Sequence, residues 1–230
     1  MIIGVDEAGR GPALGPLVVA AIRIDDADLP RLKELGVRDS KQLRPARREV
    51  LAPALREICD VGLVVVEARD LDRMRSKLTM NQIEEQAFAA AVCQLEISDG
   101  TELQLDAADV IADRFGRVVE AHICDYYEQR GLAGPRLRVI SQHKADVNWP
   151  AVAAASIIAK QHRDHCIALL QSELGEPIGS GYPSDPATKK FLQSWFERHS
   201  GPPPGARQSW ETIKRFMKQK NQFRLDAYIS

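Results

Sequence analysis

The N-terminal segment constrains the fold of this chain more than any other part of the sequence. Residues 1–5 are apolar and end at two adjacent carboxylates, Asp6 and Glu7, and the turn Gly9-Arg10-Gly11 follows almost at once. The apolar run predicts a buried strand that delivers negative charge to a sheet edge, where a divalent metal can hold it. The glycines allow backbone to approach a ligand closely, and the arginine supplies a planar cation suited to phosphate. Metal carboxylates beside a phosphate-binding turn favour phosphodiester chemistry.

Two common nucleotide-binding motifs are excluded by the same segment. Residues 4–10 read G-x-x-x-x-G-R, which lacks the Lys-Ser/Thr pair of a P-loop and has carboxylates where phosphates would lie. The dinucleotide fingerprint requires a helix after the glycines, whereas Pro12 and Pro16 flank this turn and residues 17–22 resemble another strand. No nucleotide cofactor is expected.

Hydrophobic periodicity predicts an α/β protein with a mixed five-stranded sheet, helices on both faces and a small C-terminal helical extension. The first strands are expected to form an antiparallel meander. Short apolar, β-branched runs predict strands at 2–6, 16–24, 61–68, 102–106 and 137–141. Helical spacing predicts helices at 45–59, 80–97, 113–130, 149–173, 186–199 and 208–220.

The C-terminal segment differs from the rest of the 230-residue chain in charge. Residues 188–230 contain nine basic and three acidic side chains, a net charge of +6, so a total of -1 leaves about -7 on the preceding residues. The run 202–205, Pro-Pro-Pro-Gly, predicts a linker between a catalytic domain at 1–200 and a helical tail at 206–230. An acidic body with a basic tail fits an enzyme that holds cations and grips a polyanion, although a solvated basic helix explains the tail equally well.

Cysteine usage and hydropathy indicate a cytoplasmic protein. The four cysteines are far apart, form no C-x-x-C pair, and are interpreted as small buried residues of a reducing compartment. Neither a signal-like N-terminus nor an apolar run of the roughly 18 residues needed to span a bilayer is present in the sequence. No membrane partner is expected.

Two further acids follow predicted strands. Asp106 ends the strand at 102–106, and Asp146 follows the strand at 137–141 across a short polar loop. Because ligands collect at the carboxyl ends of strands in such sheets, these acids are expected to join Asp6 and Glu7 at one rim. Oxygen-only ligation favours Mg²⁺ or Mn²⁺, with two ions expected during catalysis. Asp109 is an alternative to Asp106.

Several segments in fixed order resemble ribonuclease HII, the type 2 ribonuclease H family, in its archaeal and eukaryotic branch. The matching blocks are Val5-Asp6-Glu7-Ala8-Gly9-Arg10-Gly11 with Gly15-Pro16, Asp39-Ser40-Lys41-Gln42-Leu43, Leu105-Asp106-Ala107, His143-Lys144-Ala145-Asp146, residues 151–160 and Gly179-Ser180-Gly181-Tyr182. The resemblance extends over nearly the whole length of the chain.

The resemblance implies a ribonuclease H-like fold and a metal-dependent endonuclease. The implied substrates are RNA/DNA hybrids and duplex DNA with single embedded ribonucleotides, cut on the 5′ side to give 3′-hydroxyl and 5′-phosphate ends. By motif match, Asp6, Glu7, Asp106 and Asp146 are the catalytic metal ligands. The same match assigns substrate binding to Gly9, Arg10, Gly11, Ser40, Lys41 and Tyr182, with the glycine turn in the minor groove, where a 2′-hydroxyl distinguishes RNA from DNA.

Two further assignments rest on less specific sequence motifs. His143 and Lys144 precede Asp146 and could assist substrate or product at the metals, or be ordinary loop residues. The C-terminal residues 222–229 resemble a peptide that docks into sliding clamps, with Gln222, Leu225, Tyr228 and Ile229 as its contacts, or they form a frayed end.

Two other functions share parts of this pattern. A catalytically silent nucleic-acid-binding module would bind hybrids whether or not metal is present, and the intact set of acids disfavours it. A junction resolvase of the same fold would cleave branched all-DNA duplexes. The leading prediction is a monomeric ribonuclease H.

Overall fold

The computed structural model describes residues 1–37 and 43–229 of the chain, and for residues 221–229 it describes the backbone alone. Contacts divide the chain into two compact units. Unit 1 contains residues 1–8, 18–65 and 78–162, and unit 2 contains residues 9–17, 66–77 and 163–230. Each unit is built around its own hydrophobic core.

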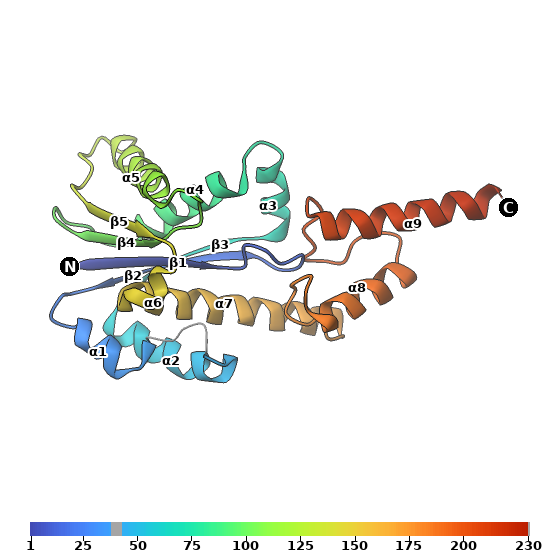
Figure 1. Cartoon of the computed structure of the whole chain (residues 1–230), viewed down its shortest axis with the longest axis horizontal. Helices are drawn as coiled ribbons and strands as arrows, with labels where there is room; N and C mark the ends of the chain where they lie inside the picture. The colour runs from blue at the N-terminus through green and yellow to red at the C-terminus, as the bar shows by residue number, and fades with distance from the viewer. Residues whose placement is uncertain (38–42, 230) are drawn as a thin grey trace. The chain divides into compact units, whose positions relative to one another are not determined.

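The centre of unit 1 is a mixed five-stranded sheet in the order β3-β2-β1-β4-β5 (Figure 1). The strands are β1 (Ile2–Ala8), β2 (Leu17–Ile24), β3 (Asp60–Val66), β4 (Glu102–Asp106) and β5 (Arg138–Gln142). β1 pairs antiparallel with β2 and parallel with β4, which pairs parallel with β5. The predicted fold class is therefore confirmed, with strand boundaries within two residues of those expected.

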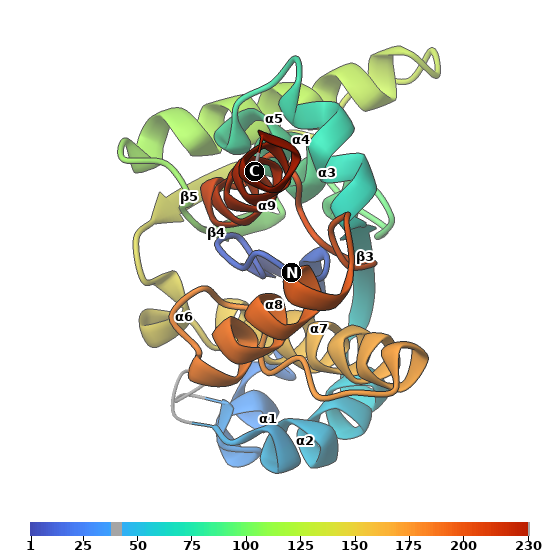
Figure 2. The same cartoon turned by 90° about the vertical axis from the view of Figure 1, so that its right-hand side faces the viewer.

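Helices cover both faces of this sheet. They are α1 (Leu29–Glu34), α2 (Pro45–Ile58), α4 (Met80–Val92), α5 (Ala112–Glu128), α6 (Ala145–Asn148) and the first half of α7 (Pro150–Leu174). Figure 2 shows α4 and α5 on the opposite side of the sheet from α1 and α2. Local sequence signals fix several helix starts: Pro45 occupies the first turn of α2, and Thr79 and Gln82 form a capping box at α4.

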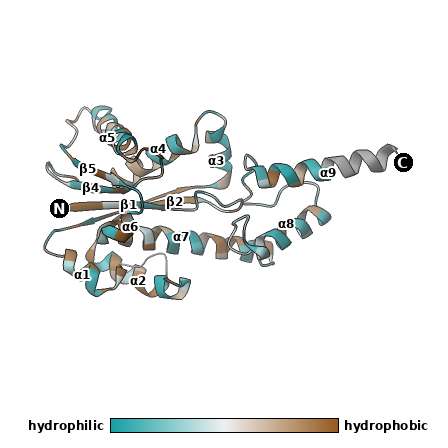
Figure 3. Cartoon of the chain, viewed as in Figure 1, coloured by the Kyte–Doolittle hydropathy of each residue, from teal (hydrophilic) through white to brown (hydrophobic). Residues whose placement is uncertain are grey.

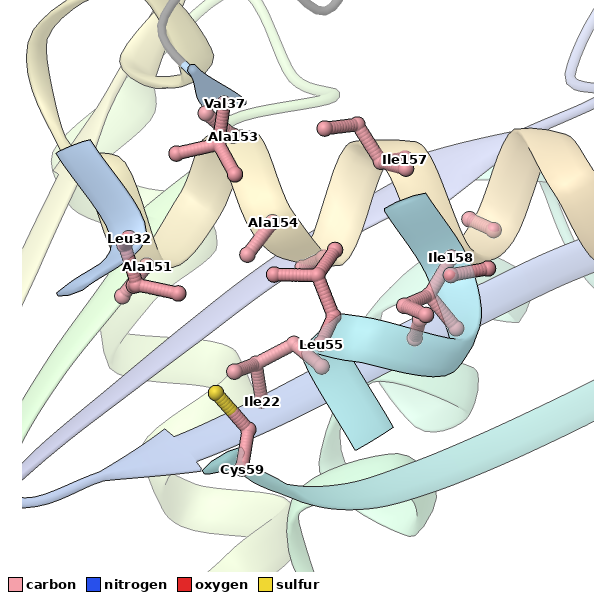
Figure 4. Close-up of a cluster of buried hydrophobic side chains, with 14 of the residues drawn as sticks. Ile22, Leu32, Val37, Leu55, Cys59, Ala151, Ala153, Ala154, Ile157 and Ile158 are labelled. Carbon is pink, nitrogen blue, oxygen red and sulfur yellow. The ribbon is translucent and has the colours of Figure 1, made fainter. Parts of the chain in front are cut away.

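The main core of unit 1 lies between β2, α1, α2 and α7. Figure 4 shows Leu32 beside Ala151 of α7, and Leu55 beside Ile22, in this layer. On the opposite face Phe88 of α4 packs edge to face against Phe115 of α5, with ring centroids 5.0 Å apart. Figure 3 shows how strongly hydrophobic residues dominate β1, the strand that both layers sandwich. Burial of these side chains supplies the driving force that fixes β1 at the centre.

Helix α7 packs directly on β1 because both surfaces are made of small residues. A Cβ atom added at Gly4 would come within 2.3 Å of the Ala151 carbonyl carbon, so only glycine fits there. The small side chains at 151–155 are all buried. This close approach confirms that the apolar segment 151–159 is core, and it brings the residues of α7 close to the C-terminal end of β1.

Unit 2 is built from α3 (Ala68–Arg75), the second half of α7, α8 (Pro186–Arg198) and α9 (Glu211–Ile229) together with the loop at residues 9–17. Its core joins Leu14 of that loop to Phe191 and Phe196 of α8 and to Ile213 of α9. Phe196 stacks on Phe216 with centroids 5.3 Å apart. The residues that follow the proline run at 202–204 are therefore packed into this core.

Several local expectations were wrong. Helices α1, α3 and α6 were not predicted because each is too short for a periodic pattern to emerge. β3 lies next to β2 in the sheet, and α1 and α2 lie between these two strands in the sequence. Helix α4 ends at Val92 rather than at 97. Shortly beyond it, the Gln94 side chain bonds to both the N–H and the C=O of Leu63 on the edge strand β3, at 2.9 and 3.0 Å.

Two further expectations concern the burial of the cysteines and the lack of a membrane-spanning segment. All four cysteines are free, but only Cys59 is buried, whereas Cys124 is exposed. Among the helices in the described residues, none combines the length and apolar composition of a membrane span.

Candidate functional site

Three of the four predicted carboxylates converge at the C-terminal edge of the sheet in unit 1. One oxygen from each of Asp6, Asp106 and Asp146 lies within 4.8 Å of the others. The register explains the first pair: Val5 of β1 lies beside Leu105 of parallel β4, so the next residue on each strand emerges at the same edge. Asp6 and Asp146 are buried, and Asp106 is half-buried.

Asp146 reaches this cluster through a strained turn after β5. Lys144 has φ 56° and ψ 39°, the left-handed conformation, and is the sole described non-glycine residue with positive φ. Such a conformation costs of order 1 kcal/mol or more in a residue with a side chain. It starts α6 and aims the Ala145 N–H at Asp106 Oδ1, at 3.1 Å. The backbone of this turn therefore positions two of the three acids.

His143 supports the loop that follows β4. Its Nδ1 and Nε2 lie 3.3 and 3.2 Å from the carbonyl oxygens of Ala107 and Val110. The imidazole thus joins the segment after Asp106 to the segment before Asp146. This contact gives His143 a structural task beside the acids.

Glu7 lies next to the cluster but is not one of the three converging carboxylates. Its N–H donates to Asp6 Oδ1 at 2.8 Å, and β1 stays paired with β2 as far as Ala8. In a continuing strand, consecutive side chains point to opposite faces. β1 therefore remains a paired strand through both acids.

The alternative acid Asp109 belongs to a different group of side chains. It forms an ion pair with Arg114 and accepts from Asn81 Nδ2 at 2.9 Å. Arg114 also donates to the buried Glu85 at 3.0 Å. Asp109 therefore belongs to a separate ion-pair group with Arg114.

Electrostatics in the acid cluster disfavour the charged state of Asp6. Burial, and then the charges of Glu7 and Asp106, raise the pKa of Asp6 well above its ordinary value of 3.8. A hydrogen bond from Ser156 and the charge of Lys160 act in the opposite direction without cancelling the rise. The surroundings of Asp6 therefore favour its protonated form when no cation is bound.

Ser156 and Lys160 are functional neighbours to which the sequence analysis gave no role. Lys160 Nζ donates to Ser156 Oγ at 2.7 Å, a contact between successive turns of α7. The available signal was Ser156 itself, the single polar residue between Ala151 and Ala159.

The donor set of the cluster fits a hard divalent cation. Its ligands are carboxylate oxygens, with no cysteine or histidine among the three that converge. Mg²⁺ and Mn²⁺ prefer such ligands, and a cation would supply the positive charge that the raised pKa of Asp6 indicates is missing. The residues present therefore suit the predicted metal.

The predicted glycine turn lies in unit 2, where backbone hydrogen bonds fix its loop. The N–H groups of Ala13 and Leu14 donate to Gly181 O at 2.8 and 3.2 Å, and that of Gly15 donates to Gly205 O at 2.9 Å. Gly9 and Gly15 have φ of 92° and 85°, which favours glycine. The loop at 9–17 and the segment carrying Tyr182 are thus held together.

Tyr182 follows Gly181 and is 37% exposed, so its ring is available to a ligand. The guanidinium carbon of Arg163 lies 5.1 Å from the ring centroid, a cation–π contact. Asp185 organises the same segment, accepting from the N–H and hydroxyl of Ser180 at 2.7 and 2.6 Å. These hydrogen bonds lower the pKa of Asp185.

Two buried arginines of unit 2 were missed by the sequence analysis. Arg207 is fully buried, and it donates from Nε to Gly15 O at 2.9 Å, from Nη1 to Arg10 O at 3.1 Å and from Nη2 to Gly9 O at 2.6 Å. Burial, and then the charge of Arg163, lower the pKa of Arg207 to about 9. Burial also lowers the pKa of Arg163. In the sequence, these two arginines resemble ordinary basic residues of a helix and of a basic tail.

The remaining predicted site residues lie outside the described parts of the chain. Ser40 and Lys41 fall in the gap at 38–42. The side chains of Gln222, Leu225, Tyr228 and Ile229 fall in the segment for which the backbone alone is described.

Known proteins resemble this chain over almost its full length. The family described as ribonuclease HII matches residues 3–213. Ribonuclease HII of Pyrococcus furiosus is 40% identical over 231 residues, covering 98% of this chain and 97% of that protein.

Solved structures agree with the sequence match. The crystal structure of ribonuclease H2 from Pyrococcus horikoshii OT3 has a TM-score of 0.84 and 39% identity, covering 96% of this chain and 98% of that one. A PCNA:RNase HII complex from Archaeoglobus fulgidus includes a chain with a TM-score of 0.80 and 38% identity, with coverage of 94% and 96%.

Proposed function

The chain belongs to the ribonuclease HII family and is a ribonuclease H, an endonuclease for RNA/DNA hybrids; from this premise we propose that it also cuts duplex DNA on the 5′ side of a single ribonucleotide. The products would be a 3′-hydroxyl and a 5′-phosphate. The observation that carries this proposal is the convergence of Asp6, Asp106 and Asp146 within 4.8 Å, on a chain that also has an ordered glycine turn.

The proposed metal ligands are Asp6, Glu7, Asp106 and Asp146, with Mg²⁺ or Mn²⁺ as the cofactor and two ions during catalysis. When bound, such ions would lower the pKa of a water molecule and stabilise charge on the phosphate and leaving oxygen. The protein contributes the positions of the acids. Ser156 donates to Asp6, and the Ala145 N–H donates to Asp106. Each bond orients a carboxylate before any ion binds.

Substrate reading is assigned to residues of unit 2 and of the gap at 38–42. The backbone at Gly9, Arg10 and Gly11 would contact the ribonucleotide in the minor groove, where its 2′-hydroxyl is presented. Tyr182 would pack its exposed ring near the sugar and base. Ser40 and Lys41 would contact phosphate. His143 and Lys144 would assist at the metals through the loop that they organise.

The C-terminal peptide is proposed to bind a sliding clamp. The related Archaeoglobus fulgidus protein was solved in a complex with PCNA, which supports a similar partner here. The contacts would be Gln222, Leu225, Tyr228 and Ile229. Loss of clamp binding by titration calorimetry in Leu225→Ala/Tyr228→Ala, with intact hybrid cleavage, is the expected result, and unchanged affinity would contradict it.

Three coarser features complete the proposal. Residues 1–200 would form the catalytic domain, with 206–230 as a helical extension that packs into the core of unit 2. The protein would act as a monomer, and it would work in the cytoplasm, where thiols such as the four free cysteines stay reduced.

A cleavage assay tests the central proposal. The substrates are a duplex with one ribonucleotide, the matched all-DNA duplex and a continuous RNA/DNA hybrid, each with Mg²⁺ or Mn²⁺. The wild-type protein should cut the first and third and leave the second intact, and Asp6→Asn should cut none. Asp125→Asn, which removes an exposed acid of α5, is the matched control and should retain activity. An uncut single-ribonucleotide duplex, or an active Asp6→Asn variant, would overturn the proposal.

A further inference from the structure

Arg207 makes three hydrogen bonds to the backbone of the loop at residues 9–17, which contains the glycine turn. Its three nitrogens reach three separate carbonyl oxygens, of Gly9, Arg10 and Gly15, at 2.6 to 3.1 Å. The ion pairs among the described residues include neither Arg207 nor Arg163. A fully buried cation without a carboxylate is costly, so the backbone carbonyls are its main compensation.

These contacts fix which way two peptide groups face. In a planar trans peptide, the C=O of one residue and the N–H of the next point in opposite directions. Because Arg207 holds the carbonyls of Gly9 and Arg10, the N–H groups of Arg10 and Gly11 must face away from it. Gly11 is exposed, so its amide side is accessible to a ligand.

The third carbonyl has a different consequence. The peptide that follows Gly15 leads into Pro16, which has no N–H. The bond from Arg207 Nε to Gly15 O therefore anchors the far end of the loop without presenting a donor. Two peptides are oriented for binding, and the third fixes the loop.

We propose that Arg207 is a positioning residue that presents the N–H groups of Arg10 and Gly11 as a preset pair of donors for an oxygen of the substrate. The inference rests on the proposed function. The acceptor is a ribose 2′-hydroxyl or a phosphate oxygen, since both offer lone pairs to two adjacent donors. The buried cation also polarises the two peptides through their carbonyls, and a low-dielectric surrounding strengthens that effect.

Arg163 fixes the neighbouring segment to the same loop. It donates to Ser180 O at 2.9 Å and to Leu14 O at 3.3 Å, and its guanidinium faces the Tyr182 ring. A Cβ atom at Gly9 would come within 2.7 Å of Arg163 Nε, and one at Gly181 within 3.2 Å of Nη2. Because Gly9 and Gly181 have no side chain, there is room for the Arg163 guanidinium beside them.

The decisive variant is Arg207→Lys. Lysine keeps the charge, but a single ammonium cannot reach three carbonyls in the fork geometry of a guanidinium. Arg198→Lys is the matched control, since Arg198 lies in the same unit and pairs with Glu176 at the surface. Both substitutions are made in Asp146→Asn protein, so that binding is measured without cleavage.

The readout is affinity for a duplex with one ribonucleotide and for the matched all-DNA duplex. Arg207→Lys should weaken binding at least about tenfold, the loss expected for hydrogen bonds to polarised groups, whereas Arg198→Lys should not. Loss confined to the ribonucleotide duplex identifies the 2′-hydroxyl as the acceptor, and equal loss on both identifies a phosphate oxygen. Unchanged affinity in Arg207→Lys, or the same loss in Arg198→Lys, would overturn the proposal.

A second measurement does not depend on how the variant folds. In Asp146→Asn protein labelled with ¹⁵N, the amide proton resonances of Arg10 and Gly11 should move downfield when the ribonucleotide duplex is added. Amides that do not respond would overturn the proposal. Wild-type protein that cuts no duplex would instead refute the proposed function, whereas the affinity of Arg207→Lys would still decide the role of Arg207, and the amide shifts would still decide whether Arg10 and Gly11 donate.

Discussion

The acid cluster of unit 1 and the arginine pair of unit 2 solve the problem of buried charge in opposite ways. Asp6, Asp106 and Asp146 are gathered against one another, so that like charges and burial raise the pKa of Asp6. Arg163 and Arg207 are gathered against backbone carbonyls, five of which accept from them. The acid cluster suits a cation from outside the chain, whereas all three guanidinium nitrogens of Arg207 find acceptors within it.

This difference in how charge is compensated distinguishes an ion-binding site from residues that fix the backbone conformation. A cluster of like charges that protein groups only partly compensate is stable with a cation and tolerates its exchange. A guanidinium bonded to several carbonyls fixes a single backbone conformation, because each bond is lost if the loop moves. The clustered acids are suited to binding an ion, and the guanidinium bonded to backbone carbonyls is suited to fixing a loop.

The largest expected effect is loss of cleavage in Asp146→Asn. The change removes one of three converging charges without altering side-chain size, so metal affinity and the rate should both fall. We expect a decrease of at least about 100-fold, similar to the loss of one strong electrostatic contact to a transition state. Cleavage of an RNA/DNA hybrid in Mn²⁺ measures it, with Asp125→Asn as control, and near-wild-type rates would show that the cluster is not catalytic.

The next largest effect is expected for the buried arginines of unit 2. Arg163→Met should lower the free energy of unfolding by about 1–3 kcal/mol, because two acceptors, Leu14 O and Ser180 O, lose their donor. Urea denaturation measures this, and the exposed Arg198→Met change should cost less. If Arg163→Met were as stable as wild type, the arginines would not be structural supports.

Much of unit 1 could be predicted from the sequence because its signals are local or additive. Short apolar runs rich in β-branched residues predicted the strands within two residues, and the rule that ligands gather at strand ends placed Asp106 near Asp6. Asp146 was expected at the same edge because it follows the strand predicted at 137–141 across a short loop. The left-handed Lys144 that delivers it left no pattern, since lysine has no preference for that conformation.

The support residues could not be predicted because their roles depend on distant segments. Arginine is usually exposed, and Arg207 lies in a basic stretch, so composition favours a surface position. Its partners at Gly9, Arg10 and Gly15 are nearly two hundred residues away in sequence. Lys160 likewise acts through Ser156 on Asp6, a contact that depends on how closely α7 packs at Gly4.

A smaller effect should appear as a dependence of stability on pH without metal. The folded pKa of Asp6 is raised, so the folded state retains its proton where the unfolded state has lost it. This contribution to stability is complete below the ordinary value of 3.8 and is lost as pH rises through the raised pKa. Thermal melts in a chelator should show the fall, and Asp6→Asn should flatten it.

Added Mn²⁺ extends this test. A cation that binds the folded state alone raises Tm, and it competes with the proton for the same oxygens. The increase in Tm should therefore grow with pH in wild-type protein and shrink in Asp6→Asn. An increase that is independent of pH would place the ion elsewhere in the molecule.

The smallest effect comes from Glu7, whose charge contributes to the raised pKa of Asp6 although its oxygen is not among the three that converge. Glu7→Gln removes that repulsion, so without metal the protein should become more stable at neutral pH by about 1 kcal/mol, the order of one interaction between neighbouring charges. Its cleavage activity should fall less than that of Asp146→Asn, because the converging oxygens remain. If Glu7→Gln lost as much activity as Asp146→Asn without gaining stability, Glu7 would hold the metal as directly as the three converging acids do. The metal site would then depend equally on all four proposed ligands.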